Sequence, residues 1–198
     1  KPNTLIVSTS GHGIYVLNAK TGAVDLPSTT SLQQLMGTSF IGTLLLDNRG
    51  WLWAVTSHDG FKVIDLKTKK LVNINQTPEA GNVQTGQLIS SLQSDPVTGN
   101  MLIGSSSNGL YIFDAAQQRL RKPSDPNLQT KNIQSLLVKK DGTILLGSEN
   151  RGIWVFDRTT ETIMPYDVPN NAQVDLIHSK VHDLMEDNAG NLWAGLYQ

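Results

Sequence analysis

Two histidines stand just before recurring glycines and are the residues of this chain best suited to chemistry. His12 precedes Gly13, and His58 with Asp59 precedes Gly60. Imidazole nitrogens and carboxylate oxygens are ligands for zinc and related metals. The two segments belong to different repeats, however, and the sequence offers no third ligand at a fixed spacing. We therefore predict no metal site and no cofactor, and we treat these residues as candidates for binding a solute.

The glycines belong to an internal repeat. A glycine is followed five residues later by Asn or Asp, with apolar residues between them, at Gly13 to Asn18, Gly60 to Asp65, Gly109 to Asp114 and Gly152 to Asp157. These glycines are 47, 49 and 43 residues apart, a period typical of propellers, solenoids and arrays. Eight residues before each glycine a short apolar run begins, at Leu5, Leu52, Met101 and Ile144, and a fifth copy begins at Leu192.

Each repeat is expected to hold four short strands, which we name A to D. In the second repeat they are Phe40–Leu46, Trp51–Thr56, Phe61–Asp65 and Lys70–Asn75. Helical periodicity is nearly absent, and four strands in a unit of about 46 residues are typical of a propeller blade. The predicted fold class is therefore all-β, a β-propeller of four-stranded antiparallel blades with about four blades present. We expect one domain with repeats near 1–38, 39–86, 87–130 and 131–178, and a partial repeat at 179–198.

Acidic residues and glycines mark the turns between strands A and B. These turns read Asp47 to Gly50, Asp95 to Gly99, Asp141-Gly142 and Asp187 to Gly190. Glycine supplies positive φ and Asp bonds its own backbone, so we predict structural hairpin turns and not calcium loops, whose alternating oxygen ligands are missing. Trp53 and Trp193 share one position in strand B and are predicted to fill the core between blades.

Composition narrows the possible partners. The chain has 198 residues, a formal net charge of −1 and no cysteine, which excludes disulfides and thiolate chemistry. No basic stripe indicates a nucleic-acid partner, and no apolar run is long enough to span a membrane. We predict that this segment contacts neither nucleic acid nor membrane.

The repeat resembles a known family. Val181 to Gly195 is similar to the two-component regulator propeller repeat, and Leu46 to Trp53 followed by Asp59 to Asp65 carries the same motif. The resemblance implies a periplasmic sensor region of a membrane-bound bacterial hybrid histidine kinase that responds to glycan fragments or other small solutes. No kinase nucleotide site is present, so it also implies that this chain is not an enzyme and that kinase activity belongs to a longer, membrane-anchored parent.

The loops between strands B and C are the expected ligand-binding surface. In a propeller they emerge on one face together with the loops between strands D and A, and the residue before the fixed glycine changes from repeat to repeat. Loops carry recognition while strands carry packing. The candidate ligand-binding residues are His12, His58, Asp59, Asn108, Asn150 and Arg151.

The number of repeats predicts an incomplete ring. The chain begins and ends with a strand B, whereas seven blades of this period would need about 320 residues. We expect an arc cut from a seven-bladed ring, whose open ends expose apolar surface and favour self-association as a homodimer.

Two other functions stay open. A propeller enzyme of the lyase, sialidase or quinoprotein type is one, because Asn18 to Gly22 resembles part of a quinoprotein repeat. That segment is not repeated, and a sialidase would want an arginine cluster that the five arginines do not form along the sequence. A protein-interaction scaffold is the other, although no Trp-Asp dipeptide occurs.

Overall fold

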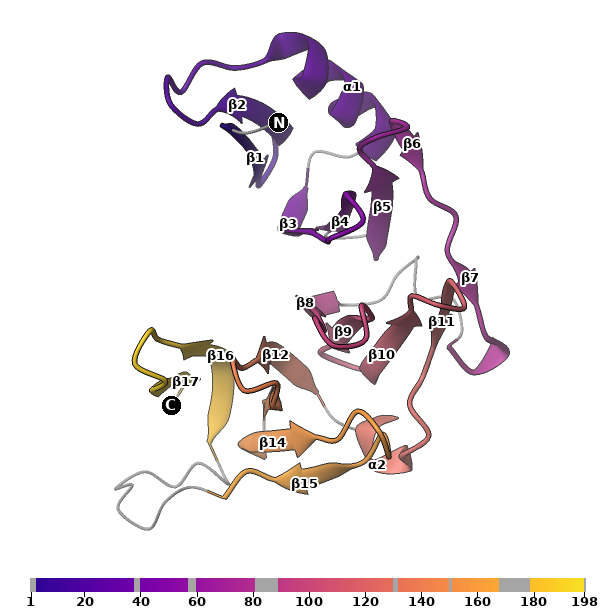
Figure 1. Cartoon of the computed structure of the whole chain (residues 1–198), viewed down its shortest axis with the longest axis vertical. Helices are drawn as coiled ribbons and strands as arrows, with labels where there is room; N and C mark the ends of the chain where they lie inside the picture. Colours follow the sequence, from indigo (N-terminus) through magenta and orange to yellow (C-terminus); the bar gives the residue numbers. More distant parts are fainter. Residues whose placement is uncertain are drawn as a thin grey trace. The chain divides into compact units, whose positions relative to one another are not determined.

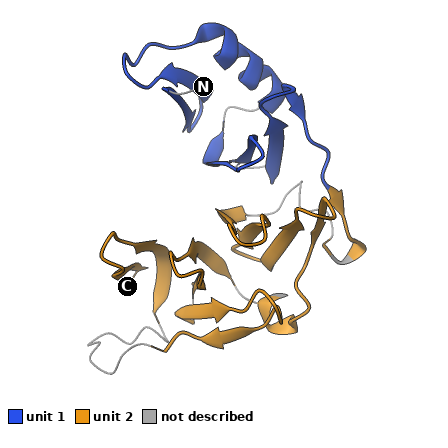
Figure 2. Ribbon diagram, in the orientation of Figure 1, with its two compact units in different colours: residues 1–74, 82–87 blue, residues 75–81, 88–198 orange. Residues whose placement is uncertain are grey.

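The computed structural model describes residues 3–37, 40–56, 60–80, 89–129, 132–149, 151–167 and 179–197 (Figure 1). The chain divides into two compact units, residues 1–74 with 82–87 and residues 75–81 with 88–198 (Figure 2). The described elements are β1 (Thr4–Thr9), β2 (Gly13–Asn18), α1 (Leu26–Met36), β3 (Ile41–Leu46), β4 (Trp51–Thr56), β5 (Phe61–Asp65), β6 (Lys70–Leu71), β7 (Asn75–Gln76), the 3₁₀ helix η1 (Pro78–Ala80), β8 (Ile89–Ser94), β9 (Met101–Ser105), β10 (Gly109–Asp114), β11 (Arg119–Arg121), α2 (Pro126–Gln129), β12 (Ile133–Val138), β13 (Ile144–Ser148), β14 (Ile153–Phe156), β15 (Ile163–Pro165), β16 (Lys180–Glu186) and β17 (Leu192–Tyr197).

Unit 1 contains the hairpin β1-β2, the helix α1 and the sheet β3-β4-β5-β6. All strand pairs in both sheets are antiparallel. Its core lies between the hairpin and the sheet, where Ile14 and Val16 pack with Leu52 and Ile64 under Met36 of the helix. The core therefore joins two consecutive repeats through the faces of their sheets, as in adjacent blades.

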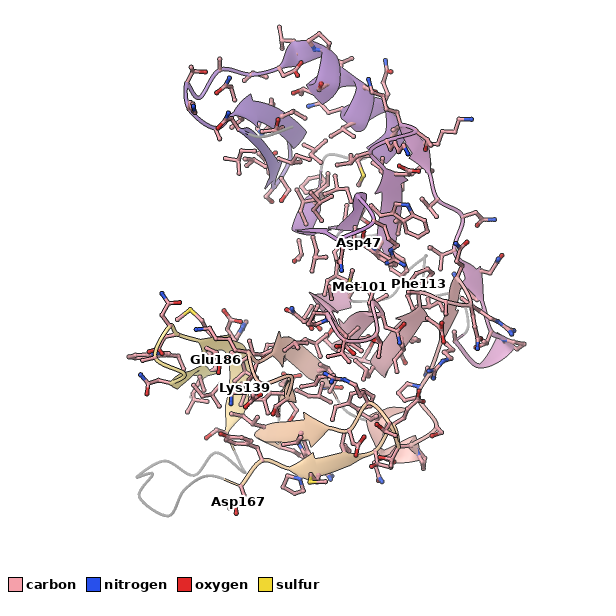
Figure 3. All side chains as sticks on the ribbon, viewed as in Figure 1. Asp47, Met101, Phe113, Lys139, Asp167 and Glu186 are labelled. Atoms are coloured by element: carbon pink, nitrogen blue, oxygen red, sulfur yellow. The ribbon has the colours of Figure 1, made fainter. Side chains whose placement is uncertain are left out.

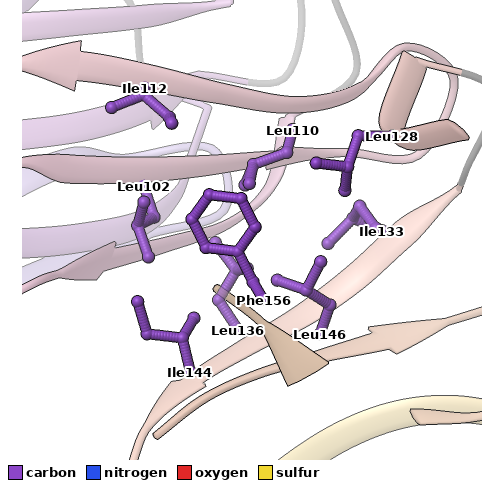
Figure 4. Packing of buried hydrophobic residues seen from close by; sticks show 9 residues of the cluster. All are labelled: Leu102, Leu110, Ile112, Leu128, Ile133, Leu136, Ile144, Leu146 and Phe156. Carbon is purple, nitrogen blue, oxygen red and sulfur yellow. The ribbon is translucent and has the colours of Figure 1, made fainter. Parts of the chain in front are cut away.

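Unit 2 contains two further blades and a hairpin. The blades are the sheets β8-β9-β10-β11-β7, whose edge strand β7 pairs in parallel, and β12-β13-β14-β15, and the hairpin is β16-β17. Nine buried apolar side chains from the two blades and α2 form one cluster, in which Phe156 lies among Leu102, Leu110 and Leu146 (Figure 4). Burying one such side chain fully stabilises the fold by about 1.5–3 kcal/mol. The main core of this unit thus also lies between consecutive blades.

The predicted strands agree closely with the structure in the middle of each blade. In the second repeat strands B and C have the predicted bounds, as β4 and β5. Strand A begins one residue late, because Phe40 makes only an isolated bridge to Ser10. The prediction of strand D over Lys70–Asn75 was too long: β6 ends at Leu71, and Asn75 belongs to β7, which pairs in parallel with β11.

The expectation of four strands in every repeat was wrong for the first repeat, where α1 follows strand C. Asp25 caps the helix by accepting a hydrogen bond from the Ser28 N–H (3.2 Å), and Pro27 stands in its first turn. Gly37 ends it with φ 61°. Leu32 and Met36 then bury the helix against β2. These start and stop signals were readable in the sequence, but the apolar spacing between them was too weak to indicate a helix.

A second repeated turn follows strand C in each of the first four repeats. The side chain of the Asn or Asp five residues after each repeated glycine accepts hydrogen bonds from the backbone N–H groups two and three residues later. These residues are Asn18, Asp65, Asp114 and Asp157. The residue four positions after each of them then adopts positive φ in all four repeats, at Gly22, Lys69, Gln118 and Glu161. Only the first of these turns has the glycine that this conformation favours.

This turn predicts a stabilising substitution. Gln118 has φ 50°, a conformation that costs an L-residue about 1–2 kcal/mol relative to the right-handed region. Gln118→Gly is therefore expected to raise the free energy of unfolding by up to about 1 kcal/mol, measured by urea denaturation. Gln117→Gly is the matched control, since Gln117 is equally exposed and does not have positive φ. Equal changes in the free energy of unfolding for Gln118→Gly and Gln117→Gly would show that the positive φ of Gln118 is not the cause.

Candidate functional site

The loops between strands B and C are closed by a hydroxyl that recurs in every repeat. The last residue of strand B is Thr or Ser, at Thr9, Thr56, Ser105 and Ser148. Its hydroxyl donates to the carbonyl of the repeated glycine at Thr9 (2.9 Å), Thr56 (3.3 Å) and Ser148 (3.1 Å). The same oxygen accepts from the backbone N–H three residues on at His12, Asn108 and Arg151. This Ser or Thr was visible in the sequence, four residues before each glycine, and it fixes the loop while leaving the tip variable.

Three of the predicted binding residues lie on these loops in the described chain. His12 and Arg151 are exposed, and Asn108 is half-buried with its amide donating to Ser107 Oγ (3.3 Å). The His12 carbonyl accepts from Gln33 Nε2 (3.4 Å), which connects this loop to α1. The other three, His58, Asp59 and Asn150, lie outside the described residues. Over the described ranges, no three His, Asp or Glu side chains lie close enough together to hold a metal ion.

Strand A carries a β-bulge in each of the four repeats after the first. The pairing with strand B shifts between Ile41 and Thr43, Ile89 and Ser91, Ile133 and Ser135, and Val181 and Asp183. The residues at the bulges are Gly42, Ser90, Gln134 and His182. Bulges re-aim a side chain and are common beside functional sites. The bulged end of strand A pairs with the end of strand B that leads into the loop, as Ile133 pairs with Ser148.

Two of the bulge residues line a pocket in unit 2. The pocket has a volume of about 210 Å³ and is lined by Gln134, Glu149, Lys180, Val181, His182 and Tyr197. We call it the bulge pocket. It joins the starts of two neighbouring A strands, β12 and β16, to the loop after β13 and to the end of β17.

Glu149 is held in place at this pocket. Its carboxylate accepts a hydrogen bond from Asn132 Nδ2 (3.1 Å), and its own N–H donates to the Asn132 carbonyl (3.1 Å). Val181 is fully buried and gives the pocket an apolar floor. The residues that line the pocket beside Val181 carry a carboxylate, an ammonium, an imidazole, an amide and a phenol. Such a set can donate to and accept from the hydroxyl, amide or carboxylate groups of a polar solute.

Sequence reasoning missed this set of residues. Glu149 lies in a predicted loop but was not among the candidates, and His182 lies in the repeat motif Val181 to Gly195 but was not among them either. A one-residue bulge leaves no local signal, because it is produced by the pairing of two strands. Ser90, at the corresponding bulge, does not serve in the same way, since its single hydroxyl proton is shared between two backbone carbonyls, those of Gly104 and Ile133.

At the opposite end of the blades, charged side chains form hydrogen bonds and ion pairs in the turns between strands A and B. Hydrogen bonds from Thr143 and Lys139 lower the pKa of Asp141 to about 2, and those from Trp193 and Asn191 lower the pKa of Asp187. Lys139 also lies beside Glu186, with Nζ and Oε1 3.8 Å apart (Figure 3). The predicted role of these acids as structural turn residues is confirmed by the same contacts.

The two tryptophans predicted as core residues have different environments. Trp53 is fully buried and packs against Phe61, with ring centroids 5.6 Å apart. Trp193 is 58% exposed, so its predicted place in the core was wrong for this chain. Both indoles nevertheless donate to the turn aspartate, Trp53 to Asp47 (3.0 Å) and Trp193 to Asp187 (2.9 Å). Trp193 lies on the last hairpin, and no described strand follows that hairpin to cover it.

These repeated, bulged, antiparallel sheets define the chain as a propeller-type fold, as predicted. The family model described as "Two component regulator propeller" matches residues 175–198, which confirms the resemblance at the last repeat. No curated protein sequence is similar enough to count as a relative.

Solved structures extend the likeness to almost the whole chain. The extracellular domain of the one-component system BT4673 from B. thetaiotaomicron superposes with a TM-score of 0.72 at 16% identity, over 98% of this chain and 25% of that one. The extracellular domain of the hybrid two-component system BT3049 from the same organism superposes with a TM-score of 0.70 at 22% identity. The match covers 98% of this chain and 24% of that one. PorZ, a surface component of the type-IX secretion system of Porphyromonas gingivalis, superposes with a TM-score of 0.64 at 17% identity. The match covers 99% of this chain and 30% of that one. The chain therefore spans 24–30% of the length of these solved chains. Among the described residues, no helix has the length and apolarity needed to cross a membrane.

Proposed function

We propose that this chain is part of the extracytoplasmic, periplasmic sensor region of a two-component signalling protein. It binds a small polar solute, such as a sugar or the end of a glycan fragment, and passes the signal to a kinase elsewhere in a longer protein. The likeness to extracellular domains of one-component and hybrid two-component systems supports this role. The match of residues 175–198 to the regulator propeller model supports it independently of the structure.

The observation that carries the proposal is the bulge pocket. Five residues with polar side chains of different chemistry line it, and Glu149 is held by one side-chain and one backbone hydrogen bond to Asn132. Pockets for drug-sized ligands have volumes of about 300–1,000 Å³. A volume of about 210 Å³ accordingly suits a single sugar ring or a molecule of similar size.

The proposed mechanism of signalling follows from where the pocket lies. It is lined by residues of two neighbouring repeats, because Gln134 belongs to β12 whereas Lys180, His182 and Tyr197 belong to β16 and β17. A ligand that bonds to both repeats favours the arrangement in which they are closest. Binding energy can therefore be converted into a change in the packing of adjacent blades.

Calorimetric titration of the chain with monosaccharides and short oligosaccharides tests this proposal. His182→Ala and Glu149→Gln are expected to weaken binding of any sugar that gives heat by about tenfold each, as expected for loss of a hydrogen bond to a buried or charged partner. His12→Ala is the matched control, because His12 is an exposed histidine outside the pocket.

Two outcomes would contradict the proposal. Heat release with candidate partner proteins alone, and with no sugar, would favour the protein-interaction scaffold. Equal weakening by His12→Ala and His182→Ala would move the binding site from the bulge pocket to the variable loop tips.

A further inference from the structure

We infer a second ligand site in unit 1, independent of the bulge pocket, that binds a small zwitterion with an apolar side chain. The site is a pocket of about 240 Å³ between the hairpin β1-β2, the first half of α1 and the turn that follows β5. We call it the helix pocket. Nothing in the proposed sensing mechanism uses it.

The helix pocket exists because a helix stands where the other repeats have strand D. In the third repeat strand D places Leu120 in the core, fully buried. In α1 the buried apolar residues, Leu32 and Met36, lie in the second half of the helix, while Leu26 at its start is 68% exposed. Thr29 holds the first half of the helix against the hairpin, since its buried hydroxyl accepts a hydrogen bond from the Val16 N–H (2.9 Å). The pocket lies beside this contact, where Asp25, Ser28 and Ser31 line it.

The floor of the pocket is apolar and comes from three separate elements. Ile6 and Val16 belong to the hairpin, Leu32 to the helix and Leu66 to the turn after β5. All four are half-buried or buried. A branched or aromatic side chain of a ligand would remove this surface from water, which is favourable by about 25 cal/mol per Å² of apolar area.

The rim of the pocket carries both signs of charge, on two residues whose backbone is hydrogen-bonded. Asp25 is held by its N–H, which donates to the Val16 carbonyl (2.8 Å), and its carboxylate bonds to Ser28. Lys69 is held by its N–H, which donates to the Asp65 carbonyl (2.8 Å) in the closed turn. Ser31 adds a hydroxyl to the same rim.

These groups together select the class of ligand. A carboxylate has about four acceptor positions, so Asp25 can accept from a ligand ammonium while it caps the helix. Lys69 and Ser31 can donate to a ligand carboxylate. An ammonium and a carboxylate above an apolar side chain describe an apolar amino acid, and the volume limits it to one residue.

Leucine and phenylalanine are the ligands to test, with isoamylamine and isocaproate as analogues that keep one charge each. Methyl NMR spectra of the chain are expected to shift at Ile6, Leu32 and Leu66 on addition of either amino acid at about 10 mM, a concentration that detects even millimolar affinity. The single-charge analogues should bind at least about tenfold more weakly, since each loses one charge-assisted hydrogen bond.

Three variants make the test specific. Ser31→Phe should fill the pocket and abolish the shifts, whereas Gln34→Phe, on an exposed position of the same helix, should leave them unchanged. Lys69→Gly should weaken binding by about tenfold without loss of stability, because Lys69 has φ 55° and glycine suits that conformation. Absence of shifts at these methyls, or equal loss in Ser31→Phe and Gln34→Phe, would overturn the inference. Binding of isoamylamine or isocaproate as tightly as leucine would overturn the zwitterion as its ligand.

Discussion

Asp47→Ala is expected to lower the free energy of unfolding of this protein by about 3–5 kcal/mol, the range found when a buried charged partner is removed. The side chain of Asp47 is 2% exposed and lies in the turn between β3 and β4. Its carboxylate accepts from the Arg49 and Trp51 N–H groups (3.0 Å each), from the Trp53 indole (3.0 Å) and from the Arg49 guanidinium (2.6 Å). Alanine leaves the fully buried Trp53 indole without this acceptor.

Asp187→Ala is the matched control. Asp187 makes the corresponding bonds to the Ala189 and Asn191 N–H groups and to the Trp193 indole, all at 2.9 Å, but on an exposed turn with an exposed tryptophan. Water can replace the lost acceptor there, so the loss of unfolding free energy should be much smaller than for Asp47→Ala. Urea denaturation followed by tryptophan fluorescence measures both. Equal losses would show that burial of the turn is unimportant.

The pH dependence of stability gives a second test of the same residue. Burial acts to raise the pKa of Asp47, but the hydrogen bonds from Trp53, Arg49 and Trp51 outweigh it, and the pKa lies below its ordinary value. The carboxylate therefore stabilises the folded state fully above its unfolded pKa of about 3.9, and this stabilisation is lost as the pH falls through the lower folded pKa. The difference in the free energy of unfolding between wild type and Asp47→Ala should accordingly become smaller as the pH falls. A difference that is constant from neutral pH to pH about 2 would contradict the role of the ionised carboxylate.

Gly147→Val is expected to lower the free energy of unfolding by about 3 kcal/mol or more, at the upper end of the range for overpacking. Gly147 lies in β13, where β16 of the next repeat crosses closely. A Cβ atom there would meet Ser135 Oγ at 2.3 Å and Val181 Cγ1 at 2.8 Å. Ser135 can rotate, but the Val181 Cβ at 3.2 Å belongs to the packed strand. Valine favours strands intrinsically, so a loss of stability would have to come from packing.

Gly195→Val separates packing from strand propensity. Gly195 has the same position in strand B of the last repeat, and the nearest atom to a Cβ there is 3.8 Å away. This substitution should be neutral or stabilising by up to about 1 kcal/mol. Thermal and urea denaturation of the two variants measure the contrast. A tolerated Gly147→Val would mean that β13 and β16 can move apart at little cost.

The repeat explains why so much of the fold was predictable. Strands B and C, the glycine turns and the turn aspartates depend on residues within a few positions of one another, as Asp47 depends on Arg49 and Trp51. The candidate site was harder to predict from the sequence. His12, Asn108 and Arg151 do lie on the predicted loops, but the residues that the structure gathers into a pocket, Gln134, Glu149 and His182, come from three strand ends.

The sequence by itself determined a chain of similar β-sheets closed by Asp, Asn and Gly turns, because these turns are made of hydrogen bonds between near neighbours. The tertiary structure alone decided the bulges, the pockets and the different environments of equivalent residues. Trp53 and Trp193 show the reason: both bond to their turn aspartate, yet one is buried and the other exposed. Burial depends on which distant strands pack against a residue, and no local pattern records that packing.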